Sequence, residues 1–206
     1  REALAKLLEA RGAAKPWPRS DAAASAAPEK RDRTRAGALW ARFADLSQIP
    51  AGESFDKILL PVERITPEII ETFGERLIGV LPPILWPADE EAFEERLAAL
   101  KAAGLREVYG DNIYAISLTR RLGLALHGGA GLNILNTEAL RHYEEEGLAS
   151  VTASFELSMR GIKSLGGSIP LGAIVYGRLP LMHFRNCPIR SQLGCAACRA
   201  RGELTD

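Results

Sequence analysis

The sequence predicts an α/β fold: a partial β/α barrel of the TIM type, preceded by a helix and a linker. Two observations lead to this prediction. From Phe55 onward, short β-branched or leucine-rich runs alternate with amphipathic segments, as in β/α units around a parallel sheet. Polar residues also recur just after the predicted strands, where a barrel builds its active site. With 47% apolar residues and a formal net charge of zero, the composition fits a soluble globular protein, and its bulk charge indicates neither a nucleic-acid nor a membrane partner.

The first region, residues 1–53, is expected to contain a helix and an Ala/Pro-rich linker. Leu4, Leu7 and Leu8 mark one apolar face of a helix over residues 1–12. Residues 13–35 are rich in alanine, proline and charge, which is typical of a linker. The segment AGALWARFADL then favours a short helix. The second region, residues 54–206, is expected to form the partial barrel with its C-terminal cysteine cluster.

The predicted barrel units follow one another along this second region. Six strands are expected, in KILLPVE, RLIGVLPPIL, REVYG, LALHG, SVTASFEL and IPLGAIVYGRLPLMH. The helices between them are expected in TPEIIETFG, DEEAFEERLAALKAAG, IYAISLTRRLG, TEALRHYEEEG and SMRGIKSLG, with Thr66 and Thr137 as N-caps. A complete TIM barrel has eight strands, so six indicate an incomplete barrel and a piece of a longer parent protein.

Candidate site residues follow the predicted strands: Glu63, Asp111, Asn112, His127, Asn133, Asn136, Ser154 and Glu156. Glu156 is expected to act as a base or to orient a substrate, or else to pair with Arg160 four residues later. His127 is a catalytic candidate, although a single histidine beside GGAG is more often a hydrogen-bonded structural residue. Asn133 either binds substrate or satisfies loop backbone.

All three cysteines, Cys187, Cys195 and Cys198, lie within twelve residues near the end of the sequence, in the spacing C-x7-C-x2-C. The C-x2-C part lets two thiolates bind one metal, and thiolates favour zinc or iron-sulfur clusters. An odd number of cysteines argues against a structural disulfide. His183, four residues before Cys187, is a candidate fourth ligand of a zinc site, and a cysteine beyond residue 206 is the alternative.

Residues 159–201 contain no acidic residue and seven basic ones: Arg160, Lys163, Arg178, Arg185, Arg190, Arg199 and Arg201. Three interpretations remain open for this charge. Basic neighbours would offset the negative charge of a thiolate cluster. The arginines would equally suit a solvated surface, or phosphate contacts with a bound RNA.

Three motifs in order carry a family resemblance: the asparagines of NILN, the S-x-E-L element of SFEL, and YGRLPLM leading into Cys187. Over residues 55–206 the sequence resembles the collagenase-like peptidase family U32. The resemblance implies a β/α barrel with clustered cysteines near its end. Relatives that hydroxylate RNA bases or a quinone precursor hold a four-iron four-sulfur cluster on four cysteines, of which this sequence supplies three. Residues 1–12 resemble the helix that precedes the last barrel domain of longer members.

The function expected from these features is metal or cluster chemistry. No H-E-x-x-H or G-x-S-x-G motif is present, and no spacing demands a catalytic Cys-His pair, so hydrolysis rests on the family name more than on residues. The alternative is a non-catalytic scaffold with a structural zinc. No run of about 18 apolar residues and no secretory signal pattern occurs, so a cytoplasmic location without membrane contact is expected.

Overall fold

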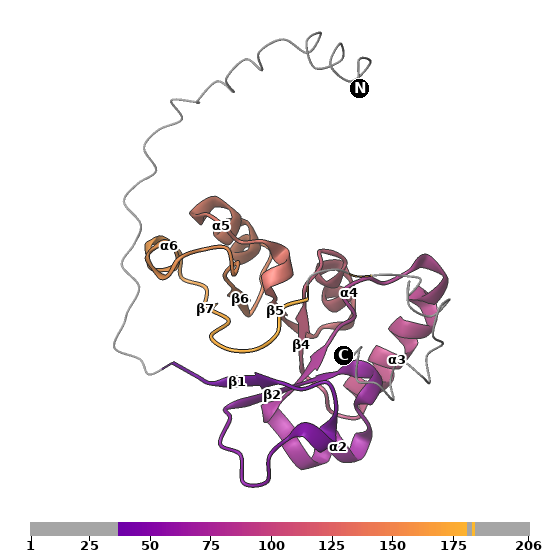
Figure 1. Ribbon diagram of the computed structural model, residues 1–206. Coiled ribbons are helices and arrows are strands. Elements are labelled where there is room, and N and C mark those ends of the chain that lie inside the picture. The colour runs from indigo at the N-terminus through magenta and orange to yellow at the C-terminus, as the bar shows by residue number, and fades with distance from the viewer. Residues whose placement is uncertain (1–36, 181–182, 184–206) are drawn as a thin grey trace, which may run out of the picture.

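The computed structural model describes residues 37–180 and His183, and within them one sheet of seven parallel strands. The strands are hydrogen-bonded in chain order: β1 (Trp40–Arg42), β2 (Lys57–Pro61), β3 (Leu77–Val80), β4 (Glu107–Gly110), β5 (Ala125–Gly128), β6 (Ser150–Thr152) and β7 (Leu171–Gly172). In a doubly wound sheet the strand order reverses at a switch point, whereas the strands of a β/α barrel pair in chain order. The sheet curls into a half-barrel (Figure 1), so the predicted fold class is confirmed.

One helix follows each strand from β2 to β6: α2 (Pro67–Phe73), α3 (Glu90–Ala102), α4 (Tyr114–Leu122), α5 (Thr137–Glu145) and α6 (Met159–Ser164). Short 3-10 helices lie at Leu46–Gln48, Val62–Arg64, Gly74–Arg76, Pro87–Asp89 and Ala130–Leu132. The helices pack on the outer, convex side of the curved sheet (Figure 1). Right-handed crossovers between consecutive parallel strands place every helix on this same side.

Alternate strand residues face two different cores. On the convex side, strand residues such as Leu60 and Leu126 pack against helix residues such as Leu97 and Leu140. On the concave side, a smaller cluster consists of Leu59, Ile78, Val80 and Tyr109, with Trp40 packed against it. The concave face is therefore a packed barrel interior rather than an open solvated surface.

Strand β1 corrects the expectation of a short helix in the segment AGALWARFADL. Trp40 and Arg42 alternate with Ala41 and pair in parallel register with Lys57 and Leu59. The amide of Phe43 extends this pairing by donating to the Leu59 carbonyl at 3.0 Å. Burial of the Trp40 side chain against the concave cluster outweighs local helix propensity here. The sheet therefore has seven described strands instead of six, and it begins upstream of residue 54.

The last two strands are shorter than the sequence predicted. After Thr152 only Ala153 keeps a bridge, to Ile134, and the chain then turns, with the Leu157 amide donating to the Ser154 carbonyl at 3.1 Å. The expected N-cap of α5 was also displaced by one residue. Asn136 is the cap, since its side chain accepts the Ala139 amide hydrogen at 2.8 Å.

Candidate functional site

A cluster of charged and aromatic side chains lies where β1, β4 and β5 end. We call Arg42, Tyr109 and Asp111 the mouth cluster. The Arg42 guanidinium pairs with the Asp111 carboxylate at 3.3 Å, and its Cζ atom lies 5.9 Å from the centre of the Tyr109 ring. The Arg42 side chain is 50% exposed and that of Asp111 only 20%. An exposed cation above an aromatic ring, at the carboxyl ends of barrel strands, is suited to hold an anionic substrate group.

The loop after β5 encloses this cluster and explains the glycines of GGAG. The Asp111 carboxylate accepts the Gly131 amide hydrogen at 3.1 Å, and the Tyr109 hydroxyl accepts that of Ala130 at 3.3 Å. A β-carbon on Gly129 would overlap the Asp111 carboxylate. The loop therefore requires glycine so that its backbone can reach Asp111.

Two tyrosines near the mouth remain protonated phenols. Burial raises the pKa of Tyr109, the nearby Asp111 carboxylate adds to the rise, and hydrogen bonds with Thr152 and the Ala130 amide oppose it. Burial also raises the pKa of Tyr114, helped by Glu63 and Asp111. The Tyr114 hydroxyl donates to the Pro82 carbonyl at 2.5 Å, so it anchors the loop that follows β3.

A second polar group, which we call the interior chain, crosses the concave face from β2 to β6. It consists of Lys57, Glu107, His127 and Ser150. The Lys57 ammonium donates to both carboxylate oxygens of Glu107 at 2.8 Å. The same carboxylate lies 3.1 Å from Nε2 of His127, whose Nδ1 lies 2.7 Å from the Ser150 hydroxyl. Trp40 reaches across from β1 and packs edge-on against the imidazole, with ring centres 4.9 Å apart.

His127 is buried, with a side chain only 9% exposed. Burial lowers its pKa, while the hydrogen bond to Glu107 and the charge of that carboxylate raise it, and Lys57 lowers it further. The ring is therefore neutral at pH 7. Because Nε2 faces a carboxylate, it carries the ring hydrogen and donates a hydrogen bond to Glu107. Nδ1 is then the nitrogen that accepts a hydrogen bond from the Ser150 hydroxyl.

The candidate residues predicted from the sequence occupy different environments. His127 is buried within β5, beside Tyr109 of the neighbouring strand. Asn133 is exposed and adopts a left-handed backbone conformation (φ 56°) that ends the 3-10 helix after β5, which fits its loop-backbone alternative. Glu156 is exposed in the turn after β6, and the described part of the chain gives it no ion pair with Arg160.

The remaining strand-end candidates are also dispersed. Asp111 belongs to the mouth cluster, and the Asn112 amide donates to the Pro83 carbonyl at 3.0 Å. Ser154 is buried, and its hydroxyl accepts the Glu156 amide hydrogen at 3.4 Å. Glu63 is exposed. Only part of the predicted ring of polar groups therefore forms a cluster.

The sequence reasoning missed Arg42, Lys57, Glu107 and Ser150. Arg42 escapes prediction because the segment AGALWARFADL favours a helix by its local sequence. Lys57, Glu107 and Ser150 are the first residues of β2, β4 and β6. The sequence criterion, a polar residue just after a strand, does not select them. The available signal was a polar residue in an inward-facing position of an otherwise apolar strand.

The predicted metal ligands Cys187, Cys195 and Cys198 lie outside the described residues. His183 is described and exposed. Within residues 37–180 and at His183, no group of three or more His, Cys, Asp or Glu side chains is placed to hold a metal ion. Three thiolates in C-x7-C-x2-C spacing fit the donor chemistry of an iron-sulfur cluster.

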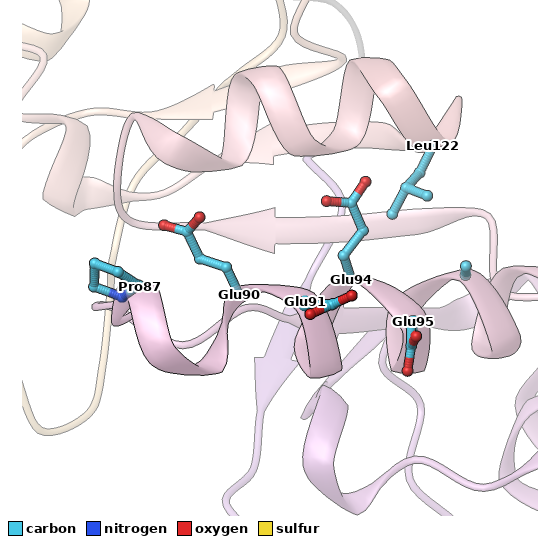
Figure 2. Close-up of a pocket in the computed structure, with 7 residues that line it drawn as sticks. Pro87, Glu90, Glu91, Glu94, Glu95 and Leu122 are labelled. Carbon is cyan, nitrogen blue, oxygen red and sulfur yellow. The ribbon is translucent and has the colours of Figure 1, made fainter.

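The convex side carries a separate surface hollow along α3 (Figure 2). Glu90 and Glu94 extend toward α4, and Leu122 at the end of α4 lines the hollow from the other side. The Glu94 carboxylate pairs with Arg121 at 2.7 Å, which lowers its pKa. The hollow lies on the helix side of the sheet, apart from both the mouth cluster and the interior chain.

Comparison with known sequences decides the family. The model of Peptidase family U32 matches residues 70–203, which include the segment of the three cysteines. The chain belongs to this family. No curated protein matches the sequence.

A solved structure supports the fold of this U32 member. It is titled "The Structure of the U32 Peptidase Mk0906", and it matches with a TM-score of 0.52 and 14% sequence identity. The match covers 85% of this chain and 83% of that one. At this identity the likeness concerns the fold alone. In the part of the chain described here, no helix combines the length and the apolarity needed to cross a bilayer.

Proposed function

We propose that this U32 chain is part of an enzyme whose reaction depends on an iron-sulfur cluster held by Cys187, Cys195 and Cys198. The observation that carries the proposal is the C-x7-C-x2-C spacing inside the segment that matches the family. The fourth ligand is a further cysteine of the parent protein or His183. The cluster supplies redox chemistry when bound.

The substrate is proposed to bind at the mouth cluster. The half-exposed Arg42 guanidinium, fixed beside Asp111 and over Tyr109, would hold an anionic group of the substrate. Two substrate kinds follow from the family resemblance: an RNA base and a small quinone precursor. Of these, RNA has the additional support of the acid-free segment at residues 159–201, whose arginines suit phosphate contacts.

Anaerobic reconstitution tests the cluster. The chain is incubated with iron and sulfide, desalted, and analysed for iron, sulfide and visible absorbance. We expect a brown protein with up to about four irons per chain. Cys195→Ser and Cys198→Ser should each lose most of the iron, whereas the exposed His142→Ala, the matched control, should not.

Zinc analysis of the same samples distinguishes an iron-sulfur cluster from a structural zinc. A colourless chain that retains one zinc and takes up no iron would contradict the cluster and support a structural zinc in a scaffold protein.

Binding of a tRNA mixture tests the proposed RNA substrate. Affinity that falls steeply with salt and weakens on Arg42→Gln would support RNA, and salt-independent or absent binding would exclude it.

A further inference from the structure

The interior chain places a hydroxyl, an imidazole and a carboxylate in the order that nucleophilic catalysis requires. The Ser150 hydroxyl lies 2.7 Å from Nδ1 of His127, and Nε2 of the same ring lies 3.1 Å from Glu107. Both distances are within hydrogen-bonding range. A nucleophile paired with a base, and the base oriented by a third group, is the arrangement by which serine hydrolases are recognised on unrelated folds.

From this geometry we infer that Ser150 is the nucleophile of an acyl-hydrolysing site on the concave face, with His127 as its general base. Neither residue belongs to the mouth cluster or to the cysteine segment. The inference is therefore independent of the iron-sulfur proposal, and either one can fail alone.

The surroundings of the imidazole favour its role as a base. The imidazole side chain is only 9% exposed, and Trp40 packs against it with ring centres 4.9 Å apart. Desolvation lowers the pKa of His127, and the ring is therefore neutral and able to accept a proton at pH 7. Glu107 is held in turn by Lys57 through both carboxylate oxygens. Glu107 and Lys57 are accordingly positioning residues.

The proposed reaction uses only an acyl substrate and water. Ser150 Oγ attacks the carbonyl carbon, its proton passes to Nδ1 of His127, and Glu107 stabilises the imidazolium. The bond to the leaving group breaks, and the leaving group takes the proton from Nδ1. Water then attacks the acyl-serine ester while His127 accepts its proton. The carboxylic acid leaves, and the proton returns to Ser150 Oγ.

The packing limits the substrate to a small acyl ester. Ser150 on β6 is only partly buried, but the part of the concave face on β2 and β3 is filled by Leu59, Ile78 and Val80, each 4% exposed or less. A bulky acyl group would need space that these side chains occupy. A short acyl group such as acetyl needs little of this space.

The test uses a fluorophosphonate probe, which phosphonylates activated serines and needs no knowledge of the natural substrate. Labelling of the whole chain is followed by tryptic digestion and fragment-ion sequencing. We expect the label on Ser150 and loss of labelling in Ser150→Ala. Ser158 lies on the same tryptic peptide and is exposed, so it is the matched control. Equal labelling of Ser158, or no labelling of folded protein, would overturn the inference.

The rates of labelling and of ester hydrolysis test the roles of His127 as base and of Glu107 as its positioning residue. His127→Gln should slow labelling, and hydrolysis of p-nitrophenyl acetate, by about 100-fold or more. In the wild type, the rate should fall at acid pH as His127 becomes protonated. Glu107→Gln should move this fall to lower pH, because Glu107 raises the pKa of His127. An inflection that stays in place would show that Glu107 does not act on the base, and the wild-type pH profile needs no variant to fold.

Discussion

At the level of single residues, the buried neutral histidine makes the stability of the fold depend on pH. Burial lowers the pKa of His127 in the folded state below its ordinary value of 6.5. Below pH 6.5 the unfolded chain therefore binds a proton that the folded chain does not. Each such proton shifts the equilibrium toward unfolding, so the free energy of unfolding should decrease as the pH falls through this window. Urea titrations at pH 7.5, 6.5, 5.5 and 5.0 measure it.

Two variants separate His127 from other groups in that experiment. His127→Gln should flatten the profile between pH 5 and 6.5, while His142→Gln, which changes an exposed side chain, should preserve it. Carboxyls whose pKa values lie below the ordinary 4.5, such as Glu53 and Glu94, contribute only at lower pH. An unchanged slope in His127→Gln would show that His127 is not the titrating group.

The site residues show which roles a sequence reveals. The candidates Asp111 and His127 were identifiable because each is a polar residue in or beside an apolar strand. Their partners Arg42, Glu107 and Ser150 were not, because hydrogen bonds between strands depend on register. Glu107, for example, pairs in register with Ala125, two residues before His127 in β5, and His127 in turn pairs with Ser150 in β6. Register follows from packing of the whole sheet and not from any one strand.

At the level of elements, the contact between β4 and α4 depends on a glycine. A β-carbon on Gly110 would lie 2.7 Å from that of Ala115 in α4 and 3.3 Å from Leu126 in the next strand. Gly110→Ala should therefore push helix and sheet apart and lower the free energy of unfolding by about 1–3 kcal/mol. Urea unfolding at pH 7.5 measures the difference.

The control for this prediction is Gly37→Ala, where no atom lies within 4 Å of the added carbon. It should change stability by less than about 0.5 kcal/mol. If Gly110→Ala were equally neutral, α4 would have to be free to shift on the sheet, contrary to the packing of its buried residues Ala115 and Leu118.

The elements also show where local pattern determines structure. Helices α3 and α4 were predicted within two residues at either end, since Gly104 and Gly123 adopt positive φ angles just after them. Strand β1 was not predicted. It spans three residues, and only pairing with β2 distinguishes Trp40–Arg42 from a helical turn. Short edge strands take their conformation from the sheet they join.

At the level of the whole molecule, β1 packs across the concave face of the curved sheet. Its side chains contact strands that lie three and four positions away in the sheet: Arg42 reaches Asp111 and Tyr109, and Trp40 reaches His127. These contacts cross the concave face, so they fix the curvature of the half-barrel. A sheet without β1 would expose Leu59 and Ile78, which are now buried.

A chain that begins at residue 54 should therefore be much less stable than one that begins at residue 37, which retains β1. Trp40 is partly buried, so loss of its contact alone should cost up to about 3 kcal/mol, the lower end of the cost of removing a large aromatic side chain from a core. We expect the shorter chain to bind a hydrophobic dye and to unfold at lower urea concentration. Trp40→Ala in the full chain should shift the midpoint in the same direction by a smaller amount, because Arg42 and the strand pairing remain. Equal midpoints for the chains starting at 37 and 54 would show that the curvature is set by β2 to β7 without β1.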